Sequence, residues 1–112
     1  MKFHNHLRSI RQTTPLHQAD IAFLTGKRDK ALISRYENGK VRPRLKVILI
    51  YMILFDVSFR IIFRRQFLQA IAFLLNRIEE RVAYLESKGD EHERIAYLKH
   101  VRNRLYNMYA NK

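Results

Sequence analysis

The feature that most constrains the fold is a series of apolar residues spaced three and four apart, interrupted at short intervals by turn-forming residues. This spacing is typical of helices that bury one face. The chain has only three Gly and two Pro among its 112 residues, whereas a many-stranded fold needs a turn about every ten residues. The sequence therefore predicts an all-α fold class.

The first part of the chain is predicted to hold five short helices. Pro15 ends the first of them, and Gly26 and Gly39 end the second and third. Asp29 is expected to cap the third helix and Ser58 the fifth. The five helices are expected at residues 4–12, 17–25, 30–38 and 45–55, and from Phe59 onward. Their core-facing residues are expected to be Leu7, Ile10, Arg11, Ile21, Ala22, Leu24, Ile33, Tyr36 and Glu37.

Two longer amphipathic helices are predicted in the second part of the chain, separated by a turn at residues 87–90. The first, about five turns long, has apolar positions at Phe67, Ile71, Leu74, Ile78, Val82 and Leu85. The second has them at Ile95, Leu98, Val101, Leu105 and Met108. A short connection between two such helices predicts an antiparallel hairpin.

The net charge of +12, from 22 Lys and Arg against 10 Asp and Glu, indicates a polyanionic partner. Nucleic acid is the first candidate and an anionic membrane surface the second. Residues 1–44 carry ten Lys or Arg and three acids, whereas residues 66–112 carry eight and six. The positive charge therefore belongs mainly to the first part of the chain.

Neither a membrane span nor export is expected. The most hydrophobic stretch, residues 45–63, is interrupted by Lys46, Asp56 and Arg60, and the start of the chain lacks the apolar run of a signal peptide. The absence of Cys excludes disulfides and thiolate zinc sites and is compatible with a reducing compartment. A cytoplasmic protein is therefore predicted.

Several features within residues 18–45 combine into one pattern. Gln18 opens a helix, Ala22 and Gly26 follow it, Ile33-Ser34 lies in the next helix, and Glu37-Asn38-Gly39 closes that helix. In order and spacing, residues 4–63 resemble the Cro/lambda-repressor-like (XRE) helix-turn-helix family of transcriptional regulators. The resemblance implies a five-helix DNA-binding domain at residues 1–63. The remaining residues, 64–112, are then expected to form a C-terminal helical hairpin for dimerisation or partner binding.

The resemblance also implies that Arg11 pairs with Glu37, because the family usually has an arginine seven residues before the glutamine that stands here at position 18. A carboxylate on the inward edge of a helix needs such a partner. Ala22 is small where two crossing helices must approach closely. We therefore expect Arg11 and Glu37 to be structural, the alternative being that one of them contacts DNA.

The residues expected to read DNA lie on the outward side of the predicted helix at 30–38. In helix-turn-helix proteins the start of the recognition helix enters the major groove. Arg35 is expected to engage O6 and N7 of guanine, and Ala31 a thymine methyl group. Lys30 and Ser34 are also expected to face base edges, whereas Gln18 and the basic loop of Lys40, Arg42 and Arg44 are expected to contact phosphates and so position the protein. The full set of predicted DNA-binding residues is Gln18, Arg28, Lys30, Ala31, Ser34, Arg35, Asn38, Lys40 and Arg42.

No pattern in the sequence predicts an enzyme, a metal site or a cofactor. The five His residues form no pair four residues apart on a helix. Glu79, Glu80 and Glu86 fall on the polar face of an amphipathic helix among basic residues, which is typical of solvated ion pairs. We therefore expect no catalytic residues.

The sequence predicts a sequence-specific, homodimeric DNA-binding repressor and leaves two alternatives open. One is an antitoxin whose C-terminal helices bind a toxin, and the other is a basic helical adaptor that binds RNA, the ribosome or polymerase. A further question concerns the nine consecutive apolar residues 47–55, since a helix buried on one face is not apolar all round. Either the C-terminal helices or a second subunit is expected to cover its outer face.

Overall fold

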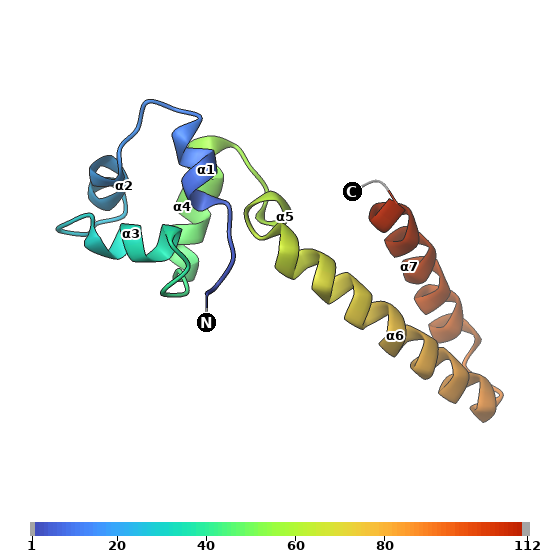
Figure 1. The fold of residues 1–112 in the computed structure, drawn as a ribbon. Coiled ribbons are helices and arrows are strands. Elements are labelled where there is room, and N and C mark those ends of the chain that lie inside the picture. The colour runs from blue at the N-terminus through green and yellow to red at the C-terminus, as the bar shows by residue number, and fades with distance from the viewer. Residues whose placement is uncertain (1, 111–112) are drawn as a thin grey trace. The chain divides into compact units, whose positions relative to one another are not determined.

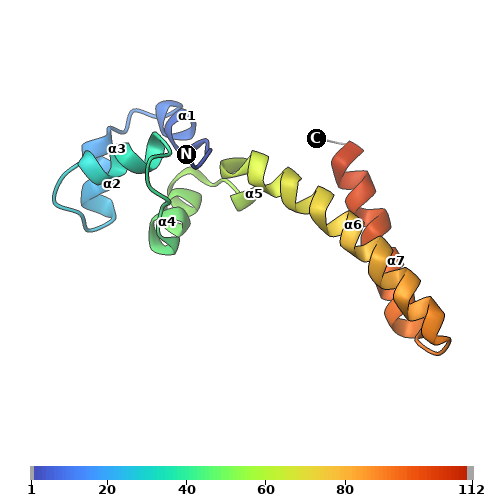
Figure 2. The ribbon, with the colours of Figure 1, turned by 60° about the horizontal axis from the view of Figure 1, so that its bottom comes forward.

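The computed structural model describes residues 2–110 and, among them, the side chains of residues 2–108. These residues form helices and no strand, which confirms the predicted all-α class (Figures 1 and 2). In chain order the helices are α1 (Leu7–Gln12), α2 (Gln18–Leu24), α3 (Ala31–Glu37), α4 (Leu45–Phe55), α5 (Phe59–Ile62), α6 (Arg64–Lys88) and α7 (His92–Ala110). The chain divides into two compact units, Met1–Gln66 and Phe67–Lys112, called here unit 1 and unit 2.

The ends of α2 and α3 are both set by a glycine in the left-handed conformation. Gly26 has φ +80° and Gly39 has φ +75°, a region that side chains with a Cβ avoid. After each glycine, the next residue's N–H bonds back to a carbonyl in the last turn, Lys27 to Ala22 at 2.7 Å and Lys40 to Arg35 at 3.0 Å. This bonding satisfies carbonyls that the helix end would otherwise leave unpaired.

The predicted break after α4 is confirmed. Asp56 is left-handed with φ 51°, and the Ser58 hydroxyl accepts from the Ile61 N–H at 3.3 Å to cap α5. The apolar stretch is therefore two helices, and no helix among the described residues is long and apolar enough to cross a membrane.

The start of α1 lies at Leu7, three residues later than predicted. The segment 2–6, called here the arm, is occupied by other bonds: Phe3 N–H donates to Gly39 O at 2.7 Å and His6 N–H donates to Ile62 O at 2.8 Å. The Asn5 side chain accepts from the Leu7 N–H at 3.0 Å and so caps the first turn of α1. The spacing of apolar residues carries no information on such long-range bonds, which explains why the start of this helix was predicted too early.

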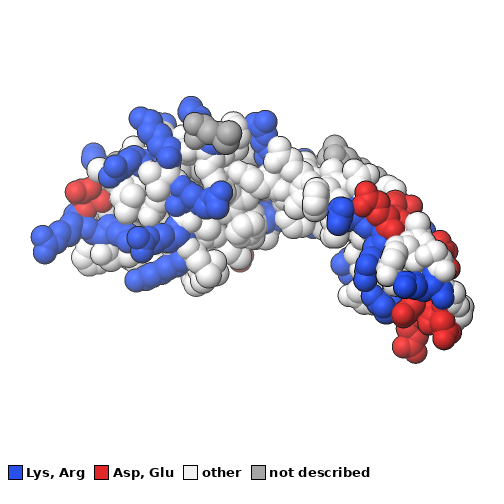
Figure 3. All heavy atoms as spheres, turned by 90° about the horizontal axis from the view of Figure 1, so that it is seen from below, with Lys and Arg blue, Asp and Glu red and all other residues white. Residues whose placement is uncertain are grey.

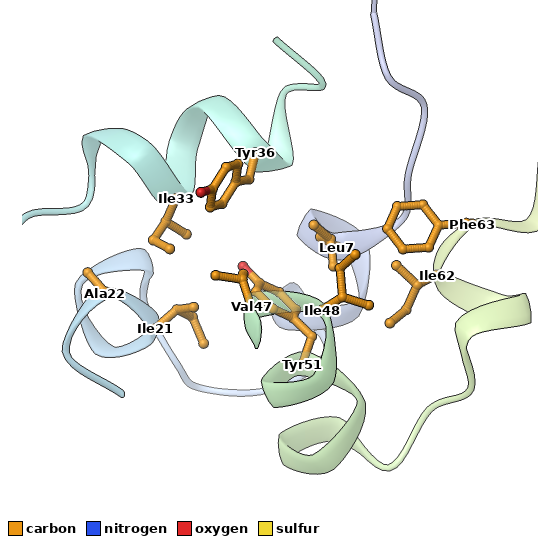
Figure 4. Close-up of a cluster of buried hydrophobic side chains, with 10 residues drawn as sticks. All are labelled: Leu7, Ile21, Ala22, Ile33, Tyr36, Val47, Ile48, Tyr51, Ile62 and Phe63. Carbon is orange, nitrogen blue, oxygen red and sulfur yellow. The ribbon is translucent and has the colours of Figure 1, made fainter. Parts of the chain in front are cut away.

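The core of unit 1 is built where α1, α2, α3, α4 and α5 meet (Figure 4). Its buried members are Leu7, Ile21, Ala22, Ile33, Tyr36, Val47, Ile48, Tyr51, Ile62 and Phe63. The prediction that Leu24 faces this core is wrong, because 47% of it is exposed. Thr25 is buried instead, and its hydroxyl donates to Ile21 O at 2.8 Å. Thr25, four residues after Ile21, lies closer to the Ile21 side of the helix than Leu24, three residues after it.

Helix α4 is apolar on both of its faces. Val47, Ile48 and Tyr51 are buried in the core, while Leu45 and Ile53 are 66% and 79% exposed. Leu49 lies between these two on the same side, four residues from each, and is also exposed. We call Leu45, Leu49 and Ile53 the outer face of α4.

Unit 2 is a hairpin in which α7 returns along α6. Its buried residues are Ile71, Ile78, Val82, Leu85, Val101 and Leu105. Ion pairs join Glu86 to Lys99 at 3.5 Å and Glu79 to Arg102 at 3.1 Å, and this order confirms the predicted antiparallel arrangement. Helix α6 has 25 residues, about seven turns rather than five.

One predicted core position of unit 2 is wrong. Leu74 is 43% exposed, and its neighbour Leu75 packs against the core in its place. Both positions fit a spacing of three or four from Ile71 and Ile78, so the apolar pattern alone does not separate them.

Candidate nucleic-acid interface

Helix α3 is held from behind by a buried carboxylate. Glu37 Oε2 accepts from Arg11 Nε at 2.9 Å, and Glu37 Oε1 accepts from Arg11 Nη2 at 3.0 Å. The two parallel bonds fix the guanidinium against the carboxylate in the fork geometry that arginine favours. Both residues are buried, which confirms the predicted pairing and leaves neither of them on the outer surface of α3.

Two further side chains complete this network. Tyr51 Oη donates to Glu37 Oε2 at 2.7 Å, and Gln18 Nε2 donates to Glu37 Oε1 at 3.0 Å. Each carboxylate oxygen therefore accepts two hydrogen bonds, and α1, α2 and α4 are all tied to the end of α3. Removal of one partner from a buried ion pair of this kind strongly destabilises the fold, because the other charge is left buried without compensation.

The network also fixes the protonation of its members. Burial raises the pKa of the Glu37 carboxyl, but the hydrogen bonds from Arg11, Gln18 and Tyr51 outweigh it and hold that pKa below its ordinary value. The hydrogen bond to Glu37 raises the pKa of Arg11 against the opposing effect of burial. Burial, followed by the bond to Glu37, raises the pKa of Tyr51 well above its ordinary value. At neutral pH the network therefore holds one negative and one positive charge.

The structure places Gln18 differently from the other predicted DNA-binding residues. Its side chain is half-buried, and one amide N–H is used by Glu37. An amide nitrogen carries two hydrogens, so one donor remains beside the first turn of α2. Gln18 is thus a member of the structural network that keeps one polar donor at the start of α2.

The outward side of α3 carries the other residues that the sequence assigned to it. Ala31, Arg35 and Asn38 are exposed and Ser34 is half-buried, with Asn38 Nδ2 and Ser34 Oγ 3.4 Å apart. Lys30 and Asn38 flank the helix and are not inside it, a difference of one residue at each end. The predicted cap is present in modified form, because Asp29 Oδ1 accepts from the Ala31 N–H at 2.8 Å. Arg28 and Lys30, on either side of Asp29, are exposed.

The loop after α3 adds a second group of cations. Lys40, Arg42 and Arg44 are exposed, while Pro43 between them is buried and anchors the loop. The Arg42 guanidinium lies 5.0 Å from the centroid of the Phe3 ring, within the range of a cation–π contact. The Phe3 ring packs edge-on against Phe63, with ring centroids 5.3 Å apart.

The contribution of the arm is the part of this surface that sequence reasoning missed. Besides the contacts of Phe3, Asn5 Nδ2 donates to Tyr36 O at 3.0 Å, which satisfies a carbonyl in the last turn of α3. Gly39 faces the arm so closely that a Cβ there would lie 2.8 Å from Phe3 O. A glycine at a helix end is explained by its backbone angle alone, so its residue type carries no separate signal of this contact.

The charge of unit 1 is strongly positive. Residues 1–66 hold 14 Lys and Arg against 4 Asp and Glu, whereas residues 67–112 hold 8 against 6. In Figure 3, most of the charged side chains visible on unit 1 are Lys and Arg, while both signs are interspersed over unit 2. Within the described residues, no three His, Cys, Asp or Glu side chains lie close enough together to hold a metal ion.

Comparisons with family models, with curated proteins and with solved structures gave no match to this chain.

Proposed function

We propose that unit 1 is a sequence-specific duplex DNA-binding domain of the Cro/lambda-repressor-like type, and that the protein is a transcriptional repressor. The observation that carries the proposal is the division of α3 into two sides. Ile33, Tyr36 and Glu37 are buried and fix the helix, while Ala31, Arg35 and Asn38 are exposed along its other side. A short, rigidly held helix with donors on its free side suits entry into a major groove.

Arg35 is the residue proposed to read a base. Its guanidinium carries donors in a fork that matches the two acceptors of guanine in the major groove, and each such pair is worth about 1–3 kcal/mol of discrimination. Ala31 is small enough to let the helix approach and to contact a thymine methyl group. Ser34 and Asn38 can both donate and accept, so they add polar contacts to base edges or to the sugar-phosphate backbone.

The remaining cations are proposed to hold the backbone. Arg28 and Lys30 precede α3, and Lys40 and Arg42 follow it, so the proposed base-reading residues lie between two basic groups. Gln18, with its remaining amide donor, adds a polar contact near the start of α2. Such contacts fix register and supply salt-dependent affinity without sequence information.

The proposed active form is a homodimer that uses the outer face of α4. Leu45, Leu49 and Ile53 form an exposed apolar strip, and such strips on soluble proteins mark interaction sites. Two copies would present two α3 helices to successive major grooves about 34 Å apart, on a near-palindromic site.

The experiment that tests this function is selection of the purified full chain against a pool of random duplex DNA. We expect enrichment of a near-palindromic motif whose half-sites are separated by about one helical turn. Binding to all duplexes without enrichment, or enrichment of RNA alone in a parallel selection, would contradict the proposal and favour a basic adaptor.

Unit 2 supports a second candidate role, contact with another protein. Phe73 and Tyr97 are 69% and 65% exposed on α6 and α7, and large exposed aromatic residues are enriched at protein interfaces. An antitoxin would use the hairpin in this way while unit 1 binds DNA. Isolation of a stoichiometric small protein with the chain, lost in a Phe73→Ser/Tyr97→Ser variant, would support this role.

A further inference from the structure

A groove with a volume of about 520 Å³ lies between the arm, α1 and the end of α3. Lys2 and His4 of the arm, Arg8 and Gln12 of α1, and Asn38 and Lys40 at the end of α3 are among the residues that line it. We call it the arm groove. It lies wholly within unit 1, and it shares Asn38 and Lys40 with the proposed DNA-binding surface.

The arm groove is strongly cationic. Lys2, Arg8 and Lys40 are exposed and have no acidic partner among the described residues. The single carboxylate in its lining is Glu37, whose charge is matched by Arg11 and whose two oxygens already accept four hydrogen bonds. Three positive charges are therefore left without compensation around one concave surface, which favours an anionic ligand.

The walls of the groove are fixed before any ligand binds. The arm is joined to the end of α3 by the bond from Phe3 N–H to Gly39 O and by the bond from Asn5 Nδ2 to Tyr36 O. The Phe3 ring contacts Phe63 and the Arg42 guanidinium and so holds the arm against the rest of unit 1. A preformed site loses less conformational entropy on binding than one that must first be ordered.

We propose that the arm groove binds a phosphate group in the backbone of the same duplex that α3 reads. The proposal rests on the proposed function and extends the interface from α3 and its loop to the arm and α1. Lys2, Arg8 and Lys40 carry only donors, which suits phosphate oxygens. The groove is continuous with the recognition surface through Asn38 and Lys40, and this continuity favours a duplex phosphate over a separate acidic peptide.

The test compares a Lys2→Ala/Arg8→Ala variant with the wild type on two duplexes, the selected motif and a scrambled sequence of equal length. Loss of one phosphate contact reduces the magnitude of the slope of log affinity against log salt by about 0.9. If variant and wild type bind equally at 1 M salt, the variant then binds roughly eight-fold more weakly than the wild type at 0.1 M salt. We expect this loss on both duplexes, with their affinity ratio unchanged.

An Arg64→Ala/Arg65→Ala variant is the matched control, because it removes two exposed cations from unit 1 outside the groove lining. Its affinity and salt slope should stay close to those of the wild type. A Lys2→Arg/Arg8→Lys variant keeps both charges and should retain the salt slope of the wild type, so that a loss confined to the alanine variant is due to charge.

Equal losses of affinity in the alanine variant and its control would contradict the proposed phosphate site, since total charge would then explain both losses. An unchanged salt slope in the alanine variant would also contradict it. Failure of the proposed function has a different signature, because the wild type would then not distinguish the two duplexes. The phosphate site in the groove is tested by the affinity and salt slope on the scrambled duplex, to which base reading does not contribute.

Discussion

At the scale of single residues, the central feature is Glu37, whose four hydrogen bonds join three other helices to the end of α3. The carboxylate lies on the helix that is proposed to read DNA, but it faces inward and is fully covered. Its partner Arg11 is buried with it, so the pair contributes to the orientation of α3 and not to the charge that DNA would meet. The position of Arg35 at the surface depends on this arrangement behind it.

Replacement of Glu37 by Gln should destabilise the chain by about 3 kcal/mol at pH 7, because it leaves the Arg11 guanidinium buried without a counter-charge. Since the pKa of Glu37 is lower in the folded chain than in the unfolded chain, its stabilising contribution is present above the unfolded value and is lost as the pH falls through the folded value. The difference between variant and wild type should therefore shrink in acid. Urea denaturation at pH 7 and at pH 3 measures both effects.

The control for this change is Glu80→Gln, since Glu80 pairs with Arg77 at 2.9 Å on the surface with both side chains mostly exposed. An exposed pair of this kind contributes less than about 1 kcal/mol. Equal effects of the two substitutions would show that the buried network does not stabilise α3.

At the scale of helices, the sequence predicted the elements well where their ends are determined locally. Gly26, Gly39 and Ser58 end or cap their helices through their own backbone angles and short-range bonds, so their residue types are sufficient to find them. The exposed positions of α3 were also predicted, because they follow from the helical spacing of its buried residues. The errors at Leu24 and Leu74 occur at the edges of apolar faces, where spacings of three and four both fit.

The arm could not be predicted, because its conformation depends on partners far away in the sequence. Phe3 bonds to Gly39, and His6 bonds to Ile62. Neither bond leaves a periodic pattern in residues 2–6, and the composition of this segment is compatible with the start of a helix. The part of the groove lining that the arm contributes was missed for the same reason.

Substitution of Gly39 by Ala tests the contact between the arm and α3. Alanine at φ +75° carries a backbone cost of about 1–2 kcal/mol, and its Cβ would also lie 2.8 Å from the Phe3 carbonyl oxygen. Gly26→Ala is the matched control, because Gly26 has φ +80° with nothing within 4 Å of an added Cβ. We expect the larger loss of thermal stability at Gly39, whereas equal losses would show that the arm does not pack tightly there.

At the scale of the whole molecule, the outer face of α4 determines the proposed assembly. Ile53 is 79% exposed, so Ile53→Glu should change the stability of the folded chain by no more than about 0.5 kcal/mol. A charge within an apolar interface should nevertheless convert a dimer to a monomer in native mass measurements. Lys46→Glu, an exposed change on the same helix, should leave the dimer intact. Dimers of equal strength in both variants would exclude this face as the interface.

The claim that α3 reads base edges is tested most directly by the binding of Arg35→Ala to the selected and scrambled duplexes at several salt concentrations. Loss of one bidentate base contact should lower affinity for the selected duplex by about 1–3 kcal/mol, or roughly 5- to 150-fold. Affinity for the scrambled duplex, which depends on phosphate contacts, should change little and should remain sensitive to salt. The account therefore predicts that Arg35→Ala reduces the preference for the selected duplex. Equal loss of affinity on both duplexes, with the preference unchanged, would contradict it.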